Sequence, residues 1–241
     1  MKKRQLATLG LTLGLVGAVG VGGTMALLSA KSETVTNTFT VGKGLHDSDI
    51  TLNEAKVDPE TGEEIVGDGA ERVQTNEYKN LEQGVELDKD PTVYIKNTAA
   101  DCYVFVKIDG LKDSNGTDPS KYYDVTIDKN WIAATTKGLS GLTEEEKKDL
   151  EAKLKNVYVY DKNQDGVITK EGDVVSGGLS GNAGLVFNGV TIKKDAPLYT
   201  YNDKNKTWEK ADLPQIVVKA CAVQANNVNG YTDALKAVTF E

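Results

Sequence analysis

The stretch Val35-Thr36-Asn37-Thr38-Phe39-Thr40-Val41 alternates between the two kinds of side chain that a half-buried β-strand needs. Val35, Asn37, Phe39 and Val41 share one face, and the three threonines share the other. Short runs rich in β-branched and aromatic residues recur along the chain between clusters of Gly, Asn and Asp, which favours antiparallel β architecture. The predicted strands cover residues 35–41, 92–96, 102–108, 123–127, 157–160, 185–192 and 216–224.

One segment breaks this β pattern. Thr143-Glu144-Glu145-Glu146 is a capping box, in which Thr143 caps the first helical turn and Glu146 reaches back to it. Leu150, Leu154 and Val157 then follow at helical spacing, so we expect a short helix inserted at about 143–156. Residues 57–76, rich in glycine and acidic residues, predict a loop or a weak hairpin.

The first 28 residues have the pattern of a targeting segment. Met1-Lys2-Lys3-Arg4 is cationic, and residues 6–28 follow without a charge. At about 1.5 Å per helical residue this run could just span a bilayer, so an uncleaved anchor is one interpretation. The small residues of Thr24-Met25-Ala26 favour the other, a helical signal peptide 1–26 cut after Ala26. We then expect residues 27–241 to form one secreted domain, which meets the membrane only through the signal segment before cleavage.

Composition limits the function classes. The 241 residues include 36 acidic and 28 basic ones, a formal net charge of −8. Cleavage after Ala26 would remove three basic residues and no acidic one, leaving 25 against 36, or −11. We therefore expect no nucleic-acid partner. The chain has one histidine, His46, and two cysteines, Cys102 and Cys221, which excludes Cys/His zinc clusters and paired-histidine metalloprotease motifs.

Several motifs, taken in order, resemble the TasA/camelysin family of proteins exported through a SipW-type signal peptidase, in its clostridial-type branch. Departures from the family pattern occur at Met25 and Leu27-Leu28, where relatives often carry aromatic residues, and at the two cysteines. The matching stretches are residues 22–26, 36–42, 87–93 with Asn97-Thr98, 103–107, 185–192 and 219–225.

This resemblance implies an antiparallel jelly-roll-like β-sandwich at the cell surface or in the extracellular biofilm matrix. It also implies a non-enzymatic structural subunit whose partners are the signal peptidase and then copies of itself or related matrix subunits. We expect assembly by strand addition, in which Val35, Asn37, Phe39 and Val41 of one subunit dock on a sheet edge of the next. The alternative for this strand is that it completes its own sheet.

Two other functions stay open at this point. The first is a monomeric cell-surface binding module. The second is a camelysin-like metallopeptidase, against which the single histidine counts, because hydrolytic zinc sites normally combine histidine with Glu or Asp. His46 lies in a polar stretch typical of a solvated loop.

The only cofactor that the sequence suggests is a weakly bound calcium ion. Residues 161–168 reproduce the first eight positions of an EF-hand loop, with oxygen-bearing side chains at positions 1, 3 and 5 and glycine at position 6. Position 12 is a glycine, and Glu171 comes one residue early. The alternative is a polar hairpin turn built on Asp-Gly. The candidate ligands are Asp161, Asn163, Asp165 and Glu171.

Both cysteines lie in predicted strands of an exported chain. A disulfide between Cys102 and Cys221 would close a loop of about 120 residues and stabilise the fold by roughly 4–5 kcal/mol. Two buried free thiols are the alternative.

Overall fold

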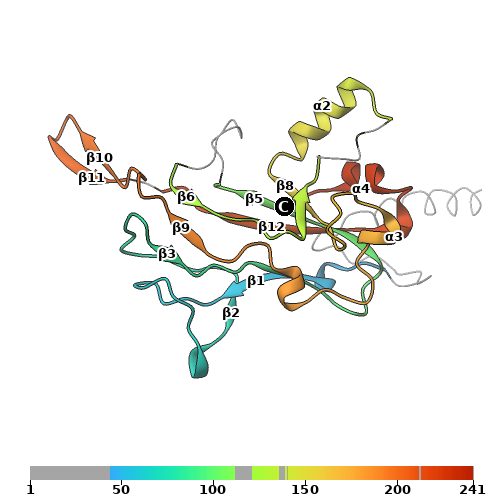
Figure 1. The fold of residues 1–241 in the computed structure, drawn as a ribbon, viewed down its shortest axis with the longest axis horizontal. Coiled ribbons are helices and arrows are strands. Elements are labelled where there is room, and N and C mark those ends of the chain that lie inside the picture. Colours follow the sequence, from blue (N-terminus) through green and yellow to red (C-terminus); the bar gives the residue numbers. More distant parts are fainter. Residues whose placement is uncertain (1–43, 112–120, 136–138, 140, 212, 241) are drawn as a thin grey trace, which may run out of the picture.

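The computed structural model describes residues 44–240 except 112–120, 136–138, 140 and 212. Within them the protein is a layered antiparallel β structure with short helices on one side (Figure 1). The prediction of a mainly antiparallel β-sandwich with a short inserted helix is confirmed. No helix in the described ranges is long and apolar enough to cross a membrane.

The central layer is a four-stranded sheet in the order β12-β5-β8-β7, with every neighbouring pair antiparallel. Its strands are β5 (Cys102–Asp109), β7 (Trp131–Ala133), β8 (Val157–Tyr160) and β12 (Val217–Gln224). β5 is covered on both faces, so the run from Cys102 to Val106 is buried without interruption. A continuous apolar run is what a strand buried on both faces requires.

The second layer is built from two smaller sheets, in the orders β2-β1-β4 and β3-β9-β6. An isolated bridge from Thr92 to Leu185 connects them, and one from Ile127 to Phe187 extends the pairing of β6 with β9. The strands are β1 (Ile50–Ala55), β2 (Arg72–Val73), β3 (Glu86–Leu87), β4 (Thr92–Ile95), β6 (Tyr123–Asp124) and β9 (Val190–Ile192).

The main core lies between these two layers. Alternate residues of β5 face β4 and β9 there, so Val104 and Val106 pack with Val93 and Phe187. Each of these four side chains is fully buried. Trp131 closes one side of this core and donates its indole N–H to the carbonyl of Leu185 at 2.8 Å.

Short helices cover the other face of the central sheet. They are α2 (Glu144–Lys153), α3 (Lys170–Asp173) and α4 (Tyr231–Ala237). Phe105 of β5 stacks on Tyr231 of α4 with ring centroids 6.3 Å apart. The predicted capping box forms at α2, because Thr143 Oγ1 accepts from the Glu146 N–H at 3.3 Å and Glu146 Oε2 accepts from the Thr143 N–H at 2.9 Å.

Several predicted strands are shorter in the structure. β6 spans only two residues of the predicted 123–127, and 185–192 becomes isolated bridges followed by β9. Residues 57–76, expected as a loop or weak hairpin, contain a bridge between Val57 and Glu64 and also provide β2. Not predicted were β1, β3, β7, α3, α4 and the projecting hairpin of β10 (Tyr199–Asn202) and β11 (Thr207–Lys210).

Candidate functional site: an open edge of the sandwich

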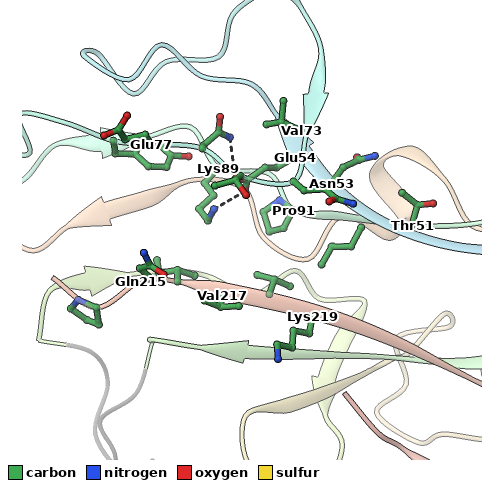
Figure 2. A pocket seen from close by; sticks show the side chains of 18 of the residues that line it. Thr51, Asn53, Glu54, Val73, Glu77, Lys89, Pro91, Gln215, Val217 and Lys219 are labelled. Atoms are coloured by element: carbon green, nitrogen blue, oxygen red, sulfur yellow. Dashed lines mark hydrogen bonds and ion pairs between the residues drawn. The ribbon is translucent and has the colours of Figure 1, made fainter. Parts of the chain in front are cut away.

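A groove of about 920 Å³ runs along one edge of the sandwich, between β1 in one layer and β12 in the other (Figure 2). Its walls are the β1 residues Ile50–Glu54 and residues 213–219 leading into β12. Residues 73–78, Lys89 and Pro91 complete the side of β1.

Both strands have a free edge here. Among the described strands, β12 is the outermost of its sheet and pairs only with β5. β1 pairs with β4 over Ile50–Asn53, while β2 covers its other edge only at Glu54 and Ala55. Successive residues of a strand direct their backbone groups to opposite sides, so about half of those in each strand point away from the paired neighbour. The groove therefore lies between two ladders that an added strand can extend.

The apolar core is incompletely covered along this edge. Ile50 and Leu52 of β1 and Val218 and Ala220 of β12 pack against the main core but are only partly buried. Val217, at the start of β12, is 38% exposed. Covering partly exposed aliphatic side chains is favourable at about 25 cal/mol per Å² of apolar surface. This edge of the sandwich would gain free energy from an apolar occupant.

Two charged groups of the groove, Lys89 and Glu54, are paired with each other. Lys89 Nζ lies 2.6 Å from Glu54 Oε2, and both side chains are largely buried. Asn76 Nδ2 donates to the other Glu54 oxygen at 3.0 Å. Burial, followed by the charges of Glu54, Asp88 and Asp90, raises the pKa of Tyr78. A carboxylate that is already neutralised by a buried lysine is poorly placed to act as a base or a metal ligand.

Arg72 closes one end of the groove. Its guanidinium donates to the backbone carbonyl of Asn53 at 3.0 Å and forms an ion pair with Asp90 at 2.8 Å. Asp90 in turn accepts from the backbone N–H of Ala55 at 2.6 Å. The free edge of β1 thus extends over residues 50–52 and stops at Asn53, whose carbonyl Arg72 already occupies.

The sequence-based site residues fall in different places. The cleavage residue Ala26 and the donor-strand residues Val35, Asn37, Phe39 and Val41 lie outside the described residues. Of the calcium candidates, Asp161, Asn163 and Asp165 share one turn, whereas Glu171 is exposed on α3. Burial, opposed by backbone hydrogen bonds, raises the pKa of Asp173, a residue that the sequence reasoning missed. In the part of the chain that is described, no three His, Cys, Asp or Glu side chains gather as a ready-made metal site.

The disulfide alternative is wrong, because both cysteines are free. β5 and β12 are neighbours, but Cys221 lies opposite Phe105 and Cys102 lies opposite Gln224. Cys102 faces the main core, and Cys221 faces the core under the helices. Two side chains on opposite faces of a sheet cannot form a bridge.

We expect neither thiol to react with iodoacetamide in the folded protein at pH 8, and both to react in guanidinium. Cys102 is fully buried and Cys221 nearly so. Burial, and next the charge of Asp101, raises the pKa of Cys102 to about 12, and burial also raises that of Cys221. At pH 8 the reactive thiolate is therefore scarce. The check is intact-mass spectrometry before and after denaturation. A starting mass that lacks both thiol hydrogens would contradict the structure.

A second exposed feature is the aromatic face of the β10–β11 hairpin. Tyr199 and Tyr201 of β10 lie on the same face as Trp208 of β11, and the rings of Tyr201 and Trp208 are 5.4 Å apart. Trp208 is 70% exposed. This hairpin projects from the sandwich (Figure 1), and β11 ends three residues before Leu213 of the groove.

Comparison with known proteins adds no relative to this picture. No protein-family model, no curated protein and no solved structure matches the chain. The likeness to the TasA/camelysin family stays a prediction from sequence motifs.

Proposed function

We propose that the protein is a non-enzymatic, secreted surface or matrix subunit that assembles by strand addition. The strand 35–41 of one copy enters the groove between β1 and β12 of the next copy and extends one of the two free edges. The single observation that carries this proposal is the groove itself, with two strand edges that no other described strand covers and partly buried aliphatic residues on both sides.

The chemistry of the donor segment fits this groove. Residues 35–41 carry no charge, and Glu54 of the groove is already neutralised by Lys89. Insertion of an uncharged strand therefore leaves this ion pair intact. Val35, Phe39 and Val41 offer aliphatic and aromatic surface to the groove, while the threonine face stays in water. Main-chain hydrogen bonds supply affinity, and the alternating side chains set the register.

Donation to a second copy and donation to the chain's own groove lead to different assemblies. When a strand is donated in trans, each subunit both gives and receives one, which joins copies head to tail. Head-to-tail contacts generate filaments when the rotation does not close into a ring. Donation to the chain's own groove would instead yield a closed monomer.

Truncation tests the proposal. A chain that begins at residue 43 lacks the donor strand but retains every residue that lines the groove. We expect it to stay monomeric by analytical ultracentrifugation and electron microscopy, where a chain that begins at Leu27 forms filaments. If the truncated chain assembles equally well, strand donation is wrong.

The same experiment addresses the monomeric binding module. If the chain from Leu27 remains monomeric at every concentration tested, assembly is excluded and a binding role is favoured. The exposed aromatic face of Tyr199, Tyr201 and Trp208 then becomes the surface to examine, because aromatic side chains are enriched at binding sites.

A further inference from the structure

The segment between β8 and α3 buries two carboxylates close together. Asp161 follows β8 and is 1% exposed, and Asp173 ends α3 and is 0% exposed. Asp165 lies between them in the chain, and the charges of Asp161 and Asp165 both act on Asp173. None of the ion pairs within the described residues includes any of these three. Buried carboxylates are normally paired with a cation or bound to a metal.

One oxygen of Asp161 has no partner. Asp161 Oδ2 accepts from the backbone N–H of Gly166 at 2.8 Å, so the carboxylate points into the turn. Asp161 Oδ1 is buried there without a hydrogen bond. The backbone N–H of Asp161 donates to the carbonyl of Asn130 at 2.6 Å, which fixes this end of the loop to the segment before β7. An orphaned, buried anionic oxygen aimed into a loop is a group that a cation would satisfy.

Asp173 takes the closing position that the sequence count assigned to Glu171. Its Oδ1 accepts from the N–H of Lys162 at 3.1 Å and its Oδ2 accepts from the N–H of Thr169 at 2.8 Å, so it spans the loop. Gly172 brings the chain close enough for this contact. A Cβ at residue 172 would come within 2.9 Å of Asn163 Nδ2. The Asn163 side chain therefore lies beside the segment that presents Asp173.

We propose that the loop from Asp161 to Asp173 binds Ca²⁺. The donors are the side-chain oxygens of Asp161, Asn163, Asp165 and Asp173 together with the backbone carbonyl of Val167. Calcium fits better than magnesium because it accepts six to eight oxygen ligands in a flexible arrangement. The ligand spacing is one residue longer than in an EF-hand, because the short helix α3 carries the last carboxylate to position 13.

Binding requires two local changes. Asn163 Nδ2 donates to Asp165 Oδ2 at 3.1 Å, and this contact must open for both side chains to turn oxygens toward the ion. Among the described residues no three acidic, histidine or cysteine side chains lie close enough to hold a metal, so the three carboxylates must also move toward one another when the ion binds. Three carboxylates then share two positive charges.

The ion would also secure the central sheet. Two residues after Asp173, Val175 exchanges both backbone hydrogen bonds with Cys102 of β5, at 2.8 and 3.1 Å. The other end of the loop leaves β8, which pairs with β5. Calcium therefore closes a loop whose two ends are both attached to β5, and it should stabilise the fold by binding only the native state.

Calcium titration of the purified, EGTA-treated full-length chain tests the site. By isothermal titration calorimetry we expect a single site with a dissociation constant of roughly 10⁻⁴–10⁻³ M, the range of extracellular modules, and a markedly weaker response to Mg²⁺. Asp165→Asn, at an exposed position, should lower the calcium affinity about tenfold or more, because it removes one ligand charge. The matched control Glu171→Gln removes an exposed acid from the same segment and should bind as the unaltered chain does.

A stability measurement separates a metal ligand from a structural residue. At 10 mM Ca²⁺ the midpoint of thermal unfolding should rise by about 3–10 °C. Asp161→Asn should abolish this rise, yet in EGTA it should unfold at the same temperature as the unaltered chain or higher, since it removes a buried charge. Absence of calcium binding at 10 mM, an equal response to Mg²⁺, or loss of binding in Glu171→Gln but not in Asp165→Asn would overturn the proposal.

Discussion

Phe39→Asp is expected to abolish filament formation while the sandwich itself remains folded. Burial of a phenylalanine contributes about 1.5–3 kcal/mol, and an aspartate in the same place would bury an unpaired charge. Subunit association should therefore weaken by at least about 100-fold. Sedimentation and negative-stain microscopy of the chain from Leu27 measure the loss, and circular dichroism verifies that the fold is unchanged.

The matched control is Thr38→Asp, one residue away on the other face of the strand. Because the threonine face stays in water, this change adds the same charge without placing it in the groove. Filaments should persist. If both variants lose assembly equally, the added charge prevents assembly regardless of the face that carries it. The proposed orientation of the strand in the groove is then wrong.

Phe105→Ala is expected to cost about 3–5 kcal/mol of unfolding free energy. Phe105 is 0% exposed on the central strand β5 and stacks on Tyr231, so its removal leaves a cavity between the sheet and α4. For a chain of this size the midpoint of thermal unfolding should fall by roughly 6–20 °C.

Val66→Ala provides the comparison for this stability change. Val66 is 77% exposed, and exposed substitutions away from structural features usually lie within about 0.5 kcal/mol. Denaturant unfolding of both variants gives the two free energies. Equal losses would mean that the face of β5 under α4 is not a packed core.

The strands that the sequence predicted best are those whose own residues indicate that they are buried, whatever their neighbours are. β5 and β12 are mostly apolar, and β8 consists of Val157-Tyr158-Val159-Tyr160, so residue type alone indicates a strand. The Thr143 capping box indicated the start of α2. These elements carry a local signal that agrees with the tertiary structure.

Other elements depend on contacts that no local pattern encodes. The run Ile-Thr-Leu-Asn-Glu-Ala of β1 buries only its last two residues fully, one of them Glu54, whose charge Lys89 neutralises from a distant segment. α4 is seven residues long and depends on packing against Phe105. The hairpin β10–β11 exposes its aromatic residues, opposite to the usual use of such side chains.

The candidate site followed from the sequence only in part. The donor segment is local and could be named, but the groove joins β1 and β12, which are separated by most of the chain, so pairing topology decides it. In the acidic loop, the spacing of an EF-hand made Glu171 the candidate for the last calcium ligand. In the structure Glu171 of α3 is exposed, and Asp173 is buried. The predicted disulfide between Cys102 and Cys221 is wrong. Successive residues of a strand point to opposite faces of the sheet, and the two cysteines face different cores.

Photo-cross-linking tests most directly whether strand 35–41 of one subunit occupies the groove of another. A photoreactive phenylalanine analogue at position 39 would be placed in an unlabelled chain, which is then assembled with an isotope-labelled chain that has Phe39. We predict cross-links to labelled peptides that contain residues 50–54 or 215–220. Cross-links confined to unlabelled peptides of the same chain would contradict assembly by strand exchange, because the strand would then complete its own sheet.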